Sequence, residues 1–282
     1  MFYVRICVVV LLVFSGFSTA SAFPGTPEDK KTANLCTDPF TYDYGPSGQK
    51  NWCGACNAPT STRQAPINIS NTHESAQPLI QFNNYNAKTN LVIYPNNPYN
   101  LKVDYKGSNN PAGTITIGND TFKLQEFHFH RPSEEAIDNR RLPMVLHLVH
   151  LKDQPGCALG NPGCAVVITV LIQQGKPEDN TSALLNILFS HFPPPTGNQN
   201  VQISLEGLIP ADYERVEGNK GYWRYDGSLT TPPCTENVTF YALKAMLTFS
   251  AEQLAEFERR YPMPNARDVQ PLNGREILNR AR

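Results

Sequence analysis

The feature that most constrains this chain is the alternation of aromatic and histidine side chains in Glu126-Phe127-His128-Phe129-His130. Residues two apart on a β-strand share a face, so His128 and His130 point to one side and the two phenylalanines to the other. The phenylalanines can pack in a core while the histidines face a cavity. The segment therefore predicts a half-buried strand in a β-rich fold.

A second strand-like run, Met144–Leu151, carries a further histidine, His147. If this run pairs antiparallel with the first through a turn at Asn139–Pro143, three imidazoles converge. His150 falls on the face opposite His147, and a structural role is expected for it. The same alternation would suit a half-buried strand with surface histidines. However, the chain has only 6 histidines, and their concentration here favours a metal site.

Three neutral imidazoles around one ion leave its fourth position open, which is typical of catalytic rather than structural zinc. Zinc in such a site lowers the pKa of a bound water and provides hydroxide at neutral pH. The histidines thus predict Zn²⁺ as the cofactor.

The first 22 residues have the pattern of an export signal: a charge at Arg5, an apolar run over Ile6–Phe14 and a small-residue cleavage site at Ala20-Ser21-Ala22. The apolar run is too short to span a bilayer, and no later segment is apolar enough to anchor the chain. We expect a secreted protein, extracellular or periplasmic, whose mature chain is 23–282. Residues 23–63 are polar and resemble an arm laid over one domain.

Cysteine usage agrees with export, because six cysteines remain beyond the signal and suggest three disulfides in an oxidising compartment. Sequence alone allows fifteen connectivities. Cys53-Gly-Ala-Cys56 could instead be a redox pair or half of a zinc knuckle, but no second CxxC and no βαβ pattern accompany it. Structural disulfides are the preferred interpretation.

Composition favours strands and turns over long helices, since the chain has 24 prolines and 18 glycines. A net charge of −1 gives no reason to expect nucleic acid or an anionic membrane as a partner. One helix is expected near Ser182–Ser190 and another over Ala251–Arg260, where Ser250 and Gln253 can form a capping box. The expected strands are Leu91–Tyr94, Leu101–Tyr105, Thr114–Ile117, Phe122–His130, Met144–Leu151, Val166–Gln173 and Val238–Leu243.

Several longer motifs occur in a characteristic order: Gln64–Ile69, Phe127–His130, His147–His150, Gly227–Glu236, and a closing segment with Asn265, Arg267, Gln270, Pro271 and Leu272. Over about Tyr42–Arg275 the chain resembles the α-carbonic anhydrase family. The resemblance implies one mainly β (α+β) domain around a large, twisted, mostly antiparallel sheet with short surface helices. It also implies reversible hydration of carbon dioxide to bicarbonate and a proton by zinc-bound hydroxide.

The resemblance implies a role for each site residue. His128, His130 and His147 would hold zinc, while Thr230 would accept a hydrogen bond from the hydroxide and pass its own proton to Glu134. Glu135 stands beside Glu134, and alignment favours Glu134. Substrate contacts would come from Thr230, Thr231, Val149, Val167, Leu229, Val238 and Phe240, and the ligands would be supported by Glu126 and Asn265.

Two positions depart from the family beside the metal. Val145 stands where the family usually has a glutamate that bonds the third zinc histidine, and Glu126 stands where it usually has a glutamine. Losing such a partner typically costs about 10–100-fold in metal affinity or activity. We hypothesise that Glu126 restores the lost charge from the neighbouring strand.

A third departure concerns proton export, because Tyr99 replaces the histidine that shuttles protons in fast family members. A tyrosine with an ordinary pKa near 10 relays protons poorly at neutral pH. Turnover should therefore be moderate and should rise with added imidazole buffer.

Among the cysteines, the resemblance pairs Cys234 with Cys53 or Cys56, and Cys56 is the closer match. Cys157 would then close a short loop with Cys164, and Cys36 would pair with Cys53. Glycosylation sequons occur at Asn68, Asn119, Asn180 and Asn237, of which Asn119 and Asn180 are favoured.

The competing hypothesis is a catalytically weak or silent secreted protein kept for binding or storage. Silent relatives usually lose zinc histidines, whereas all three remain here with Thr230 and Glu134. Expected partners are carbon dioxide and bicarbonate, with sulfonamides and anions as inhibitors. The N-terminal arm and its disulfides are compatible with a homodimer.

Overall fold

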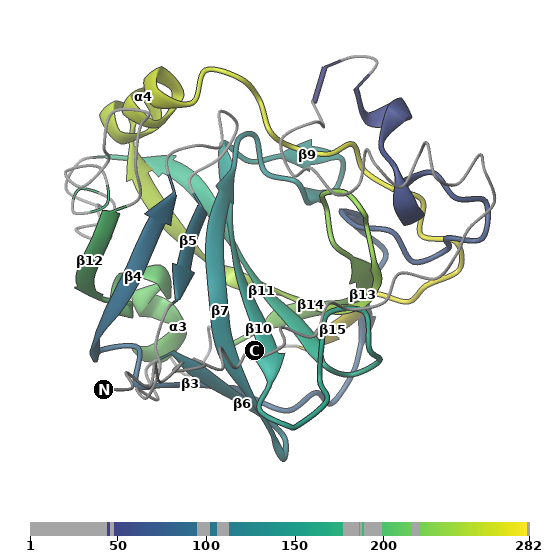
Figure 1. Ribbon diagram of the computed structural model, residues 1–282, viewed down its shortest axis with the longest axis horizontal. Helices are drawn as coiled ribbons and strands as arrows, with labels where there is room; N and C mark the ends of the chain where they lie inside the picture. Colours follow the sequence, from purple (N-terminus) through teal and green to yellow (C-terminus); the bar gives the residue numbers. More distant parts are fainter. Residues whose placement is uncertain are drawn as a thin grey trace, which may run out of the picture.

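A large sheet built on the two histidine-bearing strands organises the computed structural model (Figure 1). The structure describes residues 44–45, 48–94, 102–105, 113–176, 186, 188, 199–215 and 220–280. The expected signal segment, Cys36, Tyr99, Asn180 and most of the helix expected near Ser182–Ser190 lie outside these residues.

The described residues form 12 strands of this sheet, and along its main path the strands follow the order β12-β4-β5-β7-β10-β11-β14-β13-β15-β2, with β6 pairing β7 and β3 pairing β6. Its pairs are antiparallel except β11 with β14 and β15 with β2. The mostly antiparallel sheet predicted from the sequence is therefore confirmed. The strands of the sheet are β2 (His73–Glu74), β3 (Ile80–Asn83), β4 (Lys88–Tyr94), β5 (Lys102–Tyr105), β6 (Thr114–Ile117), β7 (Asp120–His130), β10 (Met144–Lys152), β11 (Ala165–Gly175), β12 (Gln199–Ser204), β13 (Tyr222–Ser228), β14 (Glu236–Ser250) and β15 (Leu278–Arg280).

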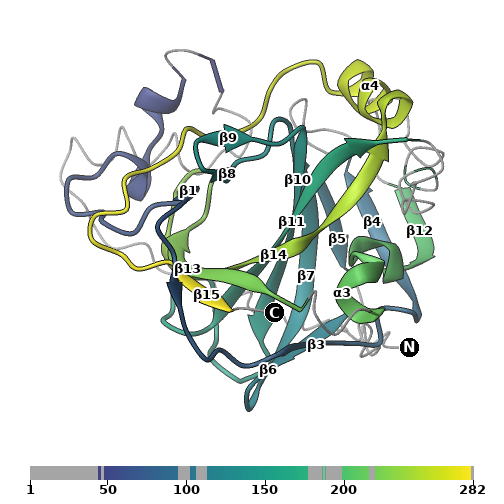
Figure 2. The same ribbon diagram turned by 180° about the vertical axis from the view of Figure 1, so that it is seen from behind.

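The remaining elements are small and lie around the sheet. Elsewhere in the described part of the chain, three strands form a second sheet: β1 (Asn68–Ile69), β8 (Ala136–Ile137) and β9 (Arg140–Arg141). Figures 1 and 2 show α3 and α4 near the β12–β4 end, and the β1-β8-β9 sheet near the opposite end. The helical segments are η1 (Gln49–Asn51), η2 (Gly54–Cys56), η4 (Glu206–Leu208), α3 (Ala211–Arg215) and α4 (Ala251–Arg260).

The two faces of β7 lie in different surroundings, as its alternation predicts. Phe127 and Phe129 are buried in the main hydrophobic core together with residues of β10, β11 and β14. His128 and His130 point to the other side, toward a second apolar cluster that includes Val149. The core thus holds one side of the strand rigidly while the other side presents imidazoles.

Helix α4 packs against β7 on the side opposite the histidines. Ser250 caps it, with the predicted capping box to Gln253 present in both directions. Phe257 of this helix packs against Phe129, with ring centroids 6.0 Å apart. The predicted bounds Ala251–Arg260 are confirmed.

The connection between β7 and β10 differs from the expectation. The two strands do pair antiparallel. However, the predicted turn at Asn139–Pro143 does not join them directly, because β8 and β9 form a small hairpin in between. Asp138 and Asn139 adopt positive φ in the turn of that hairpin, where asparagine and aspartate are tolerated.

Two disulfides join described cysteines: Cys56 with Cys234, and Cys157 with Cys164. Both pairs were expected, the first from the family resemblance and the second as a short loop closed on itself. Cys53 is also disulfide-bonded, and its expected partner Cys36 lies outside the described residues. The Cys53–Cys56 motif therefore does not close on itself as a redox pair.

Within the part of the chain that the structure describes, no helix is long and apolar enough to cross a membrane.

Candidate metal centre

Strand pairing brings the three predicted histidines together. His147 on β10 lies directly opposite His128 on β7, and His130 follows two residues later on the same face. The ring centroids are 4.8 Å apart for His128 and His130 and 5.0 Å apart for His130 and His147. One ligand nitrogen from each ring lies within 4.8 Å of the others, so a single ion can be shared.

Each ring has one nitrogen engaged by the protein. Nδ1 of His128 lies 2.9 Å from Oε2 of Glu126, and Nδ1 of His130 lies 2.7 Å from the carbonyl oxygen of Asn265. In His147 the engaged atom is Nε2, which lies 3.2 Å from Oε2 of Glu135. The remaining nitrogens are therefore Nε2 of His128, Nε2 of His130 and Nδ1 of His147.

The donor set fits a zinc ion. Nε2 of His130 is fully buried and has no hydrogen-bond partner among the described residues. A buried polar atom without a partner is costly, and a metal ion would use it. Three imidazole nitrogens, each oriented by an acceptor on the opposite side of its ring, are the usual protein ligands of a catalytic zinc site.

Burial and mutual repulsion govern the charge of these rings. Burial lowers the pKa of His130 well below its ordinary value, and the neighbouring His128 and His147 lower it further. Burial alone would also lower the pKa of His147, but attraction to Glu135 and the hydrogen bond with it raise it overall. His130 is therefore kept neutral, and His147 is held by the carboxylate of Glu135.

Glu134 lies on the metal side of the same rings. Its Oε2 is 3.3 Å from Nε2 of His130 and 3.7 Å from Nδ1 of His147, and its Oε1 accepts a hydrogen bond of 2.9 Å from the backbone N–H of Arg267. Burial raises the pKa of Glu134 to about 7, while a side-chain hydrogen bond with Thr230 lowers it. Thr230 is only 6% exposed.

Comparison with known proteins agrees with this geometry. The sequence model of the eukaryotic-type carbonic anhydrases matches residues 47–281. The chain belongs to this family. It is 35% identical to a carbonic anhydrase of Klebsiella pneumoniae over 245 residues, which are 84% of this chain and 90% of the relative.

Solved structures agree with the family. The α-carbonic anhydrase of Thermovibrio ammonificans, in complex with sulfanilamide, has a TM-score of 0.69 and 28% identity, covering 84% of this chain and 98% of that one. A carbonic anhydrase of Chlamydomonas reinhardtii, in complex with acetazolamide, has a TM-score of 0.68 and 26% identity, covering 84% and 98%. The chain is thus an α-carbonic anhydrase family enzyme, a class that uses zinc.

The apolar residues expected beside the metal gather in one cluster. Val149 pairs across the sheet with Val167, which in turn pairs with Phe240. Val238 belongs to the same buried cluster, and Leu229 packs against it. The ring of Phe240 lies 6.0 Å from that of His147, so this cluster borders the candidate carbonic anhydrase centre.

Asn265 fixes the end of β7 with all its polar groups. Its Oδ1 accepts from the backbone N–H of Arg131 at 2.7 Å, and its Nδ2 donates to the carbonyl of Phe129 at 2.9 Å. Its own carbonyl accepts from His130, as stated above. The sequence expectation placed Asn265 beside the ligands, and the structure brings it there.

The hypothesis that Glu126 restores the lost charge stays a prediction, but Glu126 is not the hydrogen-bond partner of His147. Glu126 bonds His128 on its own strand, and the carboxylate that bonds His147 belongs to Glu135. Sequence reasoning treated Glu135 only as an alternative to Glu134. It also missed Tyr225 and Thr169, whose hydroxyls both reach Glu135. Only the absence of a carboxylate at Val145 hinted that another one was needed.

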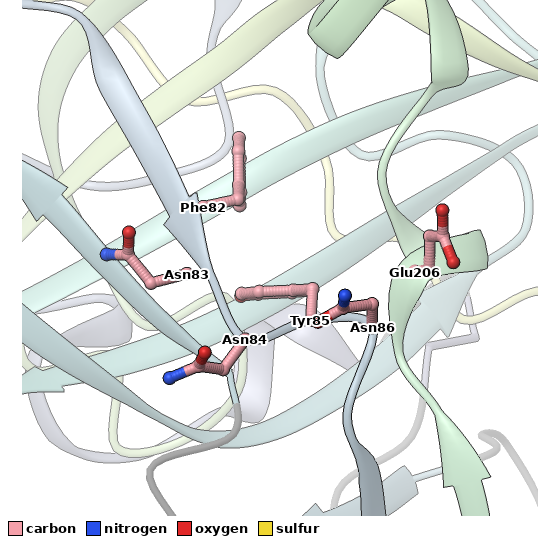
Figure 3. A pocket seen from close by; sticks show the side chains of 6 residues that line it. All are labelled: Phe82, Asn83, Asn84, Tyr85, Asn86 and Glu206. Atoms are coloured by element: carbon pink, nitrogen blue, oxygen red, sulfur yellow. The ribbon is translucent and has the colours of Figure 1, made fainter.

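Figure 3 shows a separate pocket, lined by residues of β3, of the turn after it and of η4. It has a volume of about 390 Å³, and none of the predicted site residues lines it. Its lining consists of Phe82, Asn83, Asn84, Tyr85, Asn86 and Glu206.

Proposed function

We propose that the chain catalyses the zinc-dependent reversible hydration of carbon dioxide to bicarbonate and a proton. The observation that carries this proposal is the cluster of three histidine nitrogens within 4.8 Å of one another. Membership of the carbonic anhydrase family supports it.

His128, His130 and His147 would hold the ion. When bound, zinc supplies a Lewis acid that lowers the pKa of a water molecule toward neutrality. The acceptors on Glu126, Asn265 and Glu135 fix the tautomer and direction of each ring, so that the nitrogen each acceptor leaves free faces the centre.

Thr230 and Glu134 would orient the nucleophile. The hydroxyl of Thr230 would donate a hydrogen bond to the carboxylate of Glu134, which would leave the oxygen of Thr230 to accept a hydrogen bond from the nucleophile. Only a molecule that can donate a hydrogen bond then fits against Thr230. This restriction aims the nucleophile's lone pair at the substrate, which is a positioning effect.

The apolar cluster that contains Phe240 would receive carbon dioxide. Val149, Val167 and Val238 are all at most 6% exposed, and none of them can hydrogen-bond water through its side chain. An apolar wall beside the nucleophile favours a small apolar substrate over water. Leu229 and Thr231 would complete the contact, as the resemblance implies.

We also propose that the chain is exported and processed after residue 22. The disulfides at Cys56–Cys234 and Cys157–Cys164 support this, because structural disulfides persist in oxidising compartments. Asn119 is exposed in the turn between β6 and β7, which suits a glycan if the host cell adds one.

The competing hypothesis of a silent binding or storage protein rested on Val145. The contact between Glu135 and His147 offers a carboxylate from another segment, which weakens that argument. We therefore retain the enzyme as the single proposed function.

Stopped-flow hydration of carbon dioxide on purified protein tests the proposal, with zinc content determined on the same sample. We expect near-stoichiometric zinc and turnover that a sulfonamide such as acetazolamide abolishes. His147→Ala should lose zinc and turnover together, while His73→Ala, an exposed histidine on β2, should keep both. Stoichiometric zinc without turnover in the wild type would contradict the proposed function.

A further inference from the structure

Strand β10, which carries His147, offers no hydrogen-bond acceptor for the ring at the neighbouring position on the same face. Val145 shares the face of His147 on β10, is fully buried, and offers no acceptor. In the family a glutamate usually stands at this position. Without it, Nε2 of His147 would be a buried donor with no partner from its own strand, which is costly.

Glu135 fills this place from a different segment. It follows β7 in the stretch that leads to β8, and its side chain is fully buried. Its Oε2 lies 3.2 Å from Nε2 of His147. The carboxylate thus arrives from outside β10 and reaches the same ring nitrogen.

The Glu135 carboxylate is itself fixed by two hydroxyls from two further strands. Its Oε1 accepts from Tyr225 on β13 at 3.0 Å and from Thr169 on β11 at 3.2 Å. Thr169 lies directly opposite His147 in the sheet. All of these side chains are fully buried or nearly so.

The backbone of this segment is also restrained. The hydroxyl of Ser133 donates to the carbonyl of Glu135 at 2.7 Å and accepts from the N–H of Leu142 at 2.9 Å. Ser133 therefore ties the segment before β8 to the segment after β9. A carboxylate held at backbone and side chain is suited to orienting a ring.

We infer that Glu135 is the positioning residue for His147, and that it replaces the carboxylate which Val145 has displaced from β10. This inference rests on the proposed zinc site. It assigns the two adjacent glutamates different tasks: Glu134 faces the metal side of the rings, and Glu135 holds the far side of one ring.

Zinc affinity of paired variants tests the inference. Glu135→Leu keeps the approximate size of the side chain but removes the acceptor, while Glu135→Gln keeps an acceptor oxygen. We expect Glu135→Leu to weaken zinc binding by about 10–100-fold, and Glu135→Gln to lose clearly less. The dissociation constant is measured by competition with a chelator such as dipicolinate, and Glu74→Leu on exposed β2 is the matched control.

A second variant tests whether a carboxylate on β10 can replace Glu135 as the hydrogen-bond acceptor of His147. Val145→Glu combined with Glu135→Leu returns a carboxylate to the face of His147. We expect it to recover most of the lost zinc affinity, whereas Val145→Glu alone should weaken the site because two carboxylates then crowd one nitrogen. The unfolding temperature of each zinc-free variant separates a loss of fold from a loss of metal orientation.

Equal zinc affinities for Glu135→Leu and Glu135→Gln would overturn the inference, as would a Glu135→Leu protein that binds zinc as the wild type does. If Glu135→Leu does not fold, Tyr225→Phe serves instead. It removes a hydroxyl that holds the carboxylate, and it should increase the zinc dissociation rate. An unchanged rate would overturn the inference. These readouts need no substrate, so a chain that binds zinc without hydrating carbon dioxide would contradict only the proposed function.

Discussion

At the scale of single residues, the three histidines differ in the nitrogen that the protein engages. Two rings present Nε2 to the centre, because Glu126 and Asn265 engage their Nδ1 atoms. His147 presents Nδ1, because Glu135 engages its Nε2. The acceptors therefore decide how three rings from two strands can converge on one point.

Thr230 gives the sharpest residue-scale prediction for catalysis. Thr230→Ala removes the hydroxyl that we propose links the nucleophile to Glu134, so kcat/KM for carbon dioxide should fall by about 10²-fold while zinc content stays unchanged. Thr230→Ser keeps the hydroxyl and should keep most of the activity. Stopped-flow rates with zinc analysis make the comparison. If alanine and serine variants have equal rates, the hydroxyl does not have the role proposed.

Some of these residues could be predicted from sequence and others could not. Side chains two apart on a β-strand share a face, so the alternation in Phe127–His130 predicts that both histidines point to the side opposite the phenylalanines. Glu135 shows no such pattern. Its contact with His147 depends on how the chain turns after β7, and no periodicity in the sequence encodes that turn.

At the scale of elements, strand existence was easier to predict than strand extent. β14 runs from Glu236 to Ser250, well beyond the predicted Val238–Leu243. The prediction ended too early because the later residues alternate between buried and half-buried positions and do not form an apolar run. β13 mixes aromatic and charged residues and was not predicted. Helix α4 was predicted to the residue, since a capping box marks its start locally.

A buried hydrogen bond links β10 to the turn before β4 and makes stability depend on pH. Nδ1 of His150 donates to the carbonyl of Leu148 at 3.0 Å, so its Nε2 accepts from the hydroxyl of Tyr85 at 2.7 Å. Burial lowers the pKa of His150 to about 3. The folded state therefore holds this ring neutral, whereas the unfolded state protonates it below a pKa of about 6.5.

The sign of the effect follows from proton uptake. Between pH 6.5 and 3 the unfolded chain binds one more proton at this residue, so His150 lowers the free energy of unfolding by about 1.4 kcal/mol per pH unit as pH falls. His150→Gln removes this titrating group, so the slope of the unfolding free energy against pH should decrease by about 1.4 kcal/mol per pH unit. Urea unfolding at several pH values measures the slope. His73→Gln on β2 is the exposed control. An unchanged slope for His150→Gln would show that the ring is not held neutral.

At the scale of the whole molecule, the Cys56–Cys234 disulfide joins the N-terminal segment to the loop that carries Thr230. The two cysteines are 178 residues apart, whereas Cys157 and Cys164 are 7 apart. Arg267, in the segment after α4, also holds the N-terminal segment, because it donates to the carbonyls of Cys56 and Ala65. Contacts of this kind link distant segments, and only the family resemblance made the pairing foreseeable.

The two disulfides should differ in their effect on stability. In a chain-entropy description, the Cys56–Cys234 bridge stabilises by about 3 kcal/mol more than the short one, because it closes a much longer loop in the unfolded state. Replacing each pair by serines and measuring urea unfolding tests this. The Cys157/Cys164 double variant should keep hydration activity as well. A larger loss of stability from the short loop would contradict this ordering.

A zinc titration of the metal-free protein, with hydration of carbon dioxide followed by stopped flow at each addition, tests whether the three histidines form a catalytic zinc site. We expect no catalysis without metal, a linear rise with added zinc, and a plateau at one zinc per chain, because the described residues contain one set of three imidazoles that can hold an ion. Full activity in the metal-free protein, or a fully zinc-loaded protein without activity, would contradict this expectation.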